Sequence, residues 1–116
     1  MPTFLENGMQ VVDQALIDDV VGRIVERFHP KRIVLFGSHA RGDAGPESDM
    51  DLFIEMESDL RPIDRAVAIQ RFFGLRLWGL DVFVYTPAEV AAQRGRIGNL
   101  LSYVDAEGKV LYDRPR

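Results

Sequence analysis

The chain has 116 residues and a formal net charge of −4, which fits one domain and argues against general affinity for nucleic acid, since nucleic-acid binders carry basic surfaces. The absence of cysteine excludes disulfides, thiolate metal sites and cysteine nucleophiles. No apolar run reaches membrane-spanning length, and the N-terminus lacks a basic region followed by an apolar one. We therefore expect a cytoplasmic protein that does not bind membranes.

The N-terminal quarter predicts one amphipathic helix after an unpatterned segment. Residues 1–12 show only a turn at Asn7-Gly8, and we expect them to form a poorly ordered extension. From Asp13, which can serve as the N-cap, apolar residues recur at helical spacing until Pro30 ends the helix. These apolar residues are Ile17, Val20, Val21, Ile24, Val25 and Phe28. The stripe predicts a helix with one buried face.

Two short apolar runs predict buried strands on either side of a loop. Residues 32–36 form the first run, and we expect Ser38 to cap a short helical turn through Arg41. Residues 42–47 contain two glycines and a proline, which predicts a loop. Residues 50–56 form the second strand, whose side chains alternate between two faces. One face carries Met50, Leu52, Ile54 and Met56, and the other carries Asp49, Asp51, Phe53 and Glu55.

A second long helix is expected next, capped by Ser58 or Asp59, with Pro62 in its first turn and Gly79 as its stop. Its predicted buried face consists of Ile63, Ala66, Val67, Ile69, Phe72 and Phe73. We also assign Trp78 to the core. A solvated charged face is expected for the arginines of this region, namely Arg61, Arg65, Arg71 and Arg76.

The last third predicts a strand, two short helical pieces and a final strand. Residues 81–85 form the third strand, and Thr86-Pro87-Ala88-Glu89 carries a capping box that starts a short helix. A turn at Glu107-Gly108 precedes a last strand at residues 110–112. Between them lies an amphipathic piece with Ile97, Leu100, Leu101 and Val104. The interleaved elements predict a single α/β (α+β) domain over residues 1–116, with a small mixed sheet packed with helices.

The chemistry is concentrated between Gly37 and Asp51. Asp49 and Asp51 lie one residue apart at the entry to the second strand, so their side chains project on the same face. Two neighbouring carboxylates repel each other, and a divalent cation between them removes that cost; magnesium takes such oxygen ligands. The Gly37-Ser38 turn can bring backbone N–H groups and a hydroxyl to a phosphate. A phosphate cradle beside a metal platform suggests metal-assisted phosphoryl or nucleotidyl transfer.

Gly37-Ser38, ten further residues and then Asp49-Met50-Asp51 resemble the signature of the DNA polymerase beta-type nucleotidyltransferase superfamily. The fuller string, residues 37–42 followed by residues 48–52, resembles its smallest members. These are the minimal nucleotidyltransferases, often the antitoxin partners of HEPN-domain toxins. The resemblance covers most of the chain, is weakest over residues 1–12, and implies the nucleotidyltransferase fold.

The resemblance implies that Asp49, Asp51 and Asp81 form the catalytic centre and hold two magnesium ions. One ion would bind the triphosphate, and the other would activate the acceptor hydroxyl. Asp81, at the start of the third strand, would share the catalytic ion and accept the proton of the acceptor. The structural alternative for each aspartate is a solvated position at the end of a loop or turn.

Nucleotide binding is implied for Gly37, Ser38, Arg41 and Asp49. Gly37 lets the backbone approach a phosphate, Ser38 adds a hydroxyl, and Arg41 would contact the triphosphate charge. The alternatives are an ordinary strand-to-helix turn and a surface arginine. We expect His39 to face solvent, and Ser48 either to brace the carboxylates or to cap the turn.

The implied reaction transfers AMP from ATP to a hydroxyl acceptor, with pyrophosphate leaving. Larger relatives carry a helical domain that holds the acceptor, whereas this chain ends soon after the catalytic core. We therefore expect a partner protein, or a second copy of the chain in a homo-oligomer, to supply the acceptor site. For the antitoxin-like members the implied acceptor is a tyrosine of the cognate HEPN toxin, whose ribonuclease action the added charge and bulk would block.

Other functions remain open. A non-catalytic antitoxin would silence its partner by occlusion, although the presence of all three carboxylates disfavours a decayed site. A nucleotidyltransferase acting on a small molecule is disfavoured by the short chain without an acceptor domain. A polymerase is disfavoured further by the acidic charge and the lack of a nucleic-acid channel.

Overall fold

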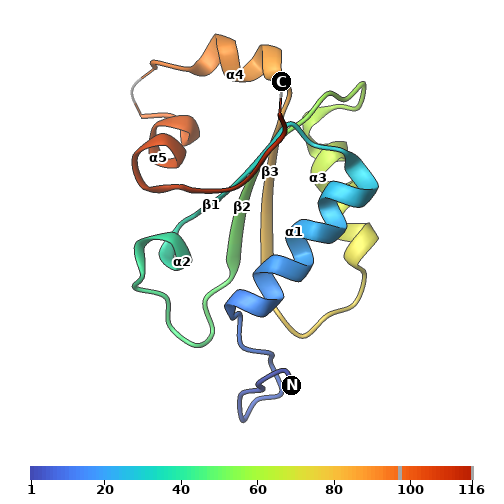
Figure 1. Ribbon diagram of the computed structural model, residues 1–116, viewed down its shortest axis with the longest axis vertical. Coiled ribbons are helices and arrows are strands. Elements are labelled where there is room, and N and C mark those ends of the chain that lie inside the picture. Colours follow the sequence, from blue (N-terminus) through green and yellow to red (C-terminus); the bar gives the residue numbers. More distant parts are fainter. Residues whose placement is uncertain (97, 116) are drawn as a thin grey trace.

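Four strands form one mixed sheet in the order β3-β2-β1-β4 (Figure 1). In this computed structural model, which describes residues 1–96 and 98–115, β1 is antiparallel to both of its neighbours, and β2 and β3 are parallel. The strands are β1 (Arg32–Phe36), β2 (Met50–Glu55), β3 (Leu80–Tyr85) and β4 (Lys109–Asp113). Ile97, which the sequence places in the amphipathic piece, lies outside the described residues. Among the described residues, no helix has the length and apolarity needed to span a membrane.

Helices cover both faces of the sheet. One face packs against α1 (Gln14–Phe28) and α3 (Pro62–Phe73). On the other side lie α4 (Pro87–Gln93) and α5 (Leu100–Glu107) (Figure 1), and the short helix α2 (Ser38–Arg41), which follows β1, places Ala40 in the core of the first face. The strand alternation divides the core in two. The larger part includes Met50, Leu52, Ile54 and Met56, as the sequence predicts, and the smaller part includes Val34, Phe36, Phe53, Val90, Leu101 and Val104.

Helix α1 confirms the first sequence prediction. The side chain of Asp13 accepts a hydrogen bond from the backbone N–H of Leu16 at 2.9 Å, so this aspartate is the N-cap. The helix ends at His29, whose φ of 52° is in the left-handed region, and Pro30 follows. Three residues of the predicted stripe are fully buried, namely Ile17, Val20 and Ile24.

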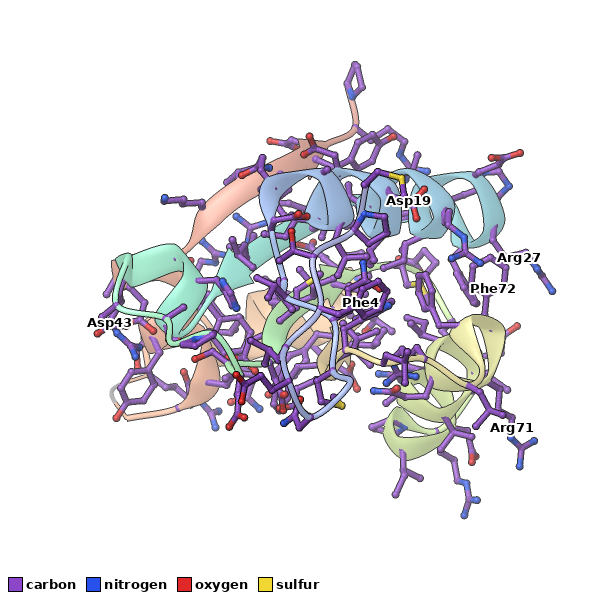
Figure 2. All side chains as sticks on the ribbon, turned by 90° about the horizontal axis from the view of Figure 1, so that it is seen from below. Phe4, Asp19, Arg27, Asp43, Arg71 and Phe72 are labelled. Carbon is purple, nitrogen blue, oxygen red and sulfur yellow. The ribbon has the colours of Figure 1, made fainter. Side chains whose placement is uncertain are left out.

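The segment before α1 folds back on itself. Phe4 and Gln10 form an isolated antiparallel bridge around the predicted turn at Asn7-Gly8, and Gly8 has a φ of 87°. The N–H of Gln10 donates to the carbonyl of Leu77, and Figure 2 shows Phe4 over the middle of the domain. These contacts place the segment beside the loop that precedes β3.

Helix α3 differs from the sequence prediction at both ends. Its N-cap is Arg61 without a side-chain cap, and neither Ser58 nor Asp59 caps it. The helix stops at Gly74, whose φ of 63° favours glycine, so Gly79 is not its stop. The buried stripe is also rotated, since Ile63 is 68% exposed and Val67 is exposed as well. The stripe of fully buried residues in α3 is Arg65, Ile69 and Phe73.

Arg65 is part of this buried face, so the prediction of a solvated face for it is wrong. Its side chain is only 7% exposed, because its guanidinium donates to the Glu89 carboxylate at 2.6 Å and to the carbonyl of Leu60 at 2.9 Å. Glu89 is also the third residue of the predicted capping box, which the structure confirms with Thr86 as the cap. A charged side chain can be buried when its hydrogen bonds are satisfied, and this pair ties α3 to α4.

Candidate active site

The three predicted aspartates come together at one end of the parallel β2–β3 pair. Asp51 and Asp81 are direct register partners, and the charge of Asp81 acts on the carboxyl group of Asp51. Asp49 immediately precedes β2, and strand alternation puts it on the same face as Asp51. This face also carries the smaller part of the core, below α4 and α5. Segments that are thirty residues apart in the chain therefore build one acidic cluster.

The carboxylates of the acidic cluster repel one another. The pKa of Asp51 rises from 3.8 to about 6, first because of desolvation and then because of the neighbouring carboxyl groups of Asp81 and Asp49. His39 acts in the opposite direction. Among the described residues, no group of three or more His, Cys, Asp or Glu side chains is arranged so that it could hold a metal ion. The oxygen-only donor set and the mutual repulsion nevertheless fit a hard divalent cation, whose charge would relieve the repulsion.

Two glycines make room for the carboxylates. Gly37, the N-cap of α2, has φ 75° and ψ −156°, and a Cβ at this position would overlap the Asp51 carboxylate. The prediction that Ser38 caps this helix is therefore wrong, since Ser38 is its first residue. A Cβ on Gly79 would overlap the Asp49 carboxylate. We predicted Gly79 to stop the helix, and this prediction is wrong. The signal for its role is its position directly before the strand that begins with Leu80-Asp81, where a side chain would collide with Asp49.

The predicted phosphate donors are already engaged by a residue that the sequence did not identify. Glu107, the last residue of α5, accepts a hydrogen bond from the backbone N–H of Gly37 at 3.3 Å and from Arg41 at 3.2 Å. Arg41 also donates to Asp43 at 3.2 Å, and these hydrogen bonds raise the pKa of Arg41. Asp43 lies at the edge of the molecule, in the loop after α2 (Figure 2). Arg41 is exposed and ends the short helix that follows Gly37, and its predicted contact with a triphosphate stays a prediction.

His39 and Ser48 support the loop that leads to β2. His39 is half-buried, and its Nε2 lies 3.0 Å from the carbonyl oxygen of Ser48, so the prediction of a solvent-facing histidine is wrong. The hydroxyl of Ser48 accepts a hydrogen bond from the N–H of Gly45 at 2.9 Å, which matches the turn-capping alternative. Together these contacts hold the loop that leads into Asp49 and β2.

The arrangement combines two chemical capacities. The carboxylates of Asp49, Asp51 and Asp81 offer the oxygen ligands that divalent cations prefer, and the Gly37 amide and Arg41 offer hydrogen-bond donors at the adjacent turn. Both groups lie at the same end of the central strands, since Phe36, the residue before Gly37, is the register partner of Asp51. The site therefore places carboxylate oxygens and anion-binding donors side by side.

Comparisons with known proteins agree with this geometry. The model of the nucleotidyltransferase domain family matches residues 17–112. A solved structure from Sulfolobus solfataricus, named as a candidate nucleotidyltransferase, has a TM-score of 0.60 and 21% identity over 86% of this chain and 79% of that one. The comparison with curated proteins gave no match.

Two further solved structures are toxin–antitoxin complexes. One contains AMP-PNP and has a TM-score of 0.55 and 20% identity; the other is a mutant of the MntA–HpeT pair, with a TM-score of 0.54 and 18% identity. Each match covers 84% of this chain and 73% of the other. At these identities the likenesses show a shared fold. The family match spans the sheet, the acidic cluster and the Gly37 turn, and the chain therefore belongs to the nucleotidyltransferase domain family.

Proposed function

We propose that this protein transfers AMP from ATP to a hydroxyl group of a partner protein, in a reaction that depends on magnesium. The observation that carries the proposal is the meeting of Asp49, Asp51 and Asp81 beside the Gly37 turn. Family membership supports nucleotidyl transfer as the reaction class. The nucleotide, the metal and the acceptor are our inference.

The donor side follows from the positions of the residues. Bound magnesium supplies positive charge to the triphosphate and lowers the pKa of the acceptor hydroxyl. Asp49 and Asp51 would hold the metal-complexed triphosphate, and the Gly37 amide and Arg41 would bind its oxygens. The acceptor oxygen forms a bond to the α-phosphorus, the bond from that phosphorus to the bridging oxygen breaks, and pyrophosphate leaves. Asp81, on the edge strand β3, takes the hydroxyl proton.

The acceptor side is open in this domain. Asp81 is exposed and lies on an edge strand, so a large acceptor can approach it from the side of the sheet. Two of the structural neighbours are toxin–antitoxin complexes, and one of these contains an ATP analogue. These neighbours support a toxin as the partner, and we propose a tyrosine of a HEPN-domain toxin as the acceptor. AMP on that tyrosine adds negative charge and bulk, which would block the ribonuclease action of the toxin.

The test is a transfer assay with the purified protein, ATP labelled at the α-phosphate, magnesium and the toxin encoded by the adjacent gene. We expect label on the toxin, at a tyrosine identified by mass spectrometry. The double variant Asp49→Asn/Asp51→Asn should lose transfer, whereas Asp59→Asn, beyond the opposite end of β2, should keep it. Equal labelling by the double variant would refute the assignment of the site. Neutralisation of the toxin without any transfer would indicate that the protein acts by occlusion.

A further inference from the structure

The Glu107 carboxylate occupies the position where the donor-nucleotide site is expected to bind an anion. One oxygen accepts a hydrogen bond from the N–H of Gly37 at 3.3 Å and from Arg41 at 3.2 Å, and the other lies 3.4 Å from the same guanidinium nitrogen. A carboxylate and a phosphate oxygen satisfy such donors in the same way. These are two of the groups that the proposed function assigns to the triphosphate.

Three packed elements fix Glu107 in this place. It ends α5 directly before β4, and Lys109 of β4 is the register partner of Leu35, so antiparallel pairing brings Glu107 opposite Gly37. Gly108 lies so close to the carbonyl of Val104 and the side chain of Val34 that a Cβ would overlap both. The contact of Glu107 with the Gly37 turn is therefore built into the sheet register.

The charges around Arg41 make this contact unfavourable for a second anion. Arg41 already pairs with two carboxylates, those of Asp43 and Glu107, at 3.2 Å each. The three groups together carry one net negative charge. A triphosphate oxygen that takes the Gly37 N–H and the Arg41 Nη1 must displace Glu107, and it meets electrostatic repulsion while Glu107 stays.

We propose that Glu107 is an internal competitor of the triphosphate, which holds the Gly37 amide and Arg41 in the free protein and must be displaced when the nucleotide binds. The proposal rests on the proposed function, because it assigns a residue to the same donor site. Glu107 then sets the affinity for the triphosphate rather than the rate of the chemical step.

The test is the affinity for magnesium and a non-hydrolysable ATP analogue, measured by calorimetry on the full chain. Glu107→Gln keeps the size of the side chain but removes the charge, and should tighten binding by about five- to thirtyfold, as expected for one lost charged hydrogen-bond competitor. In the transfer assay, KM for ATP should fall by a similar factor while kcat changes little. The matched control is Asp105→Asn, also on α5, whose carboxylate pairs with Arg94 and should leave the affinity unchanged.

Weaker or unchanged binding by Glu107→Gln would overturn the proposal, and weaker binding would indicate that Glu107 orients Arg41. Binding by the variant alone would support the proposal. Binding by neither protein, with both folded, would refute the proposed function and this inference with it. If the variant fails to fold, isotope-labelled wild-type protein gives the answer by NMR. The carboxyl carbon of Glu107 and the amide of Gly37 should both shift when the analogue binds; an unmoved Glu107 signal with bound analogue would overturn the proposal.

Discussion

Replacing Asp51 with asparagine should stabilise the metal-free protein at neutral and alkaline pH. The pKa of Asp51 is raised from 3.8 to about 6 by burial and by its two acidic neighbours. Since the folded state holds the proton more tightly than the unfolded state, stability is full below pH 4 and falls as the pH rises through about 6. Above that window the ionised carboxylate costs free energy that asparagine does not.

The size of the effect follows from the pKa. A rise from 3.8 to about 6 corresponds to about 3 kcal/mol at 1.36 kcal/mol per tenfold change in proton affinity. Asp51 is only partly buried, so solvent screening reduces the expected gain to about 1–2 kcal/mol. Magnesium should largely cancel this gain, because binding at ten times its dissociation constant stabilises the wild type by about 1.4 kcal/mol, and the variant has lost a ligand.

Urea unfolding of the wild type and Asp51→Asn, at pH 4 and pH 8, measures the effect. Each condition is run once with a chelator and once with magnesium. The gain of the variant should appear at pH 8 with the chelator, and should be small at pH 4 or with magnesium. Asp59→Asn, remote from the acidic cluster, should show no such pattern. A gain that is equal at both pH values, or absent at pH 8, would show that the three carboxylates do not repel one another as described.

Three further predictions concern single positions. Gly79→Ala places a methyl group against the Asp49 carboxylate and should lower the rate of AMP transfer by about a hundredfold, the cost of a misplaced reacting group. The control Gly22→Ala lies in open space on α1, and should keep kcat and have an unchanged or higher Tm. Arg65→Met should cost about 1–3 kcal/mol in urea unfolding, by leaving Glu89 without its partner. Arg71→Met on the exposed side of α3 (Figure 2) should cost under about 0.5 kcal/mol, and equal losses would contradict the buried pair. The pKa of Glu89 is lowered, first by the hydrogen bond from the Thr86 backbone and then by Arg65. The ionised carboxylate of Glu89 therefore stabilises the fold above its usual pKa of 4.5, and this stabilisation is lost on further acidification. The difference in unfolding free energy between Glu89→Gln and the wild type should shrink from pH 7 to pH 3.

Features set by neighbours in the chain were predictable from the sequence. The apolar run of β1, the Asp13 cap of α1 and the Thr86–Glu89 capping box depend on residues within one or two turns, and the structure confirms all three. The common face of Asp49 and Asp51 follows from strand alternation alone. The family motif added Asp81, which the parallel register then brings level with Asp51.

Features set by distant partners were not predictable. Arg65 looked like a surface residue because its acceptors, Glu89 and the carbonyl of Leu60, are brought to it only by the packing of α3 against its neighbours. Glu107 gave no signal, since its contact with Gly37 depends on the register between β4 and β1. His39 looked solvated for the same reason, because its acceptor is the backbone of a loop nine residues away.

The parallel pairing of β2 with β3 also links catalysis to the folding of the chain. A slip of one residue between these strands would turn Asp81 to the opposite face and replace it with an apolar neighbour, Leu80 or Val82. The acidic cluster thus exists only after the whole crossover through α3 has closed in the right register, a long-range step that is slow in folding. A cation held by Asp51 and Asp81 would bind only the protein with the correct strand register, and would therefore stabilise that register over the slipped ones. Hydrogen exchange in β3 should then slow when magnesium is added.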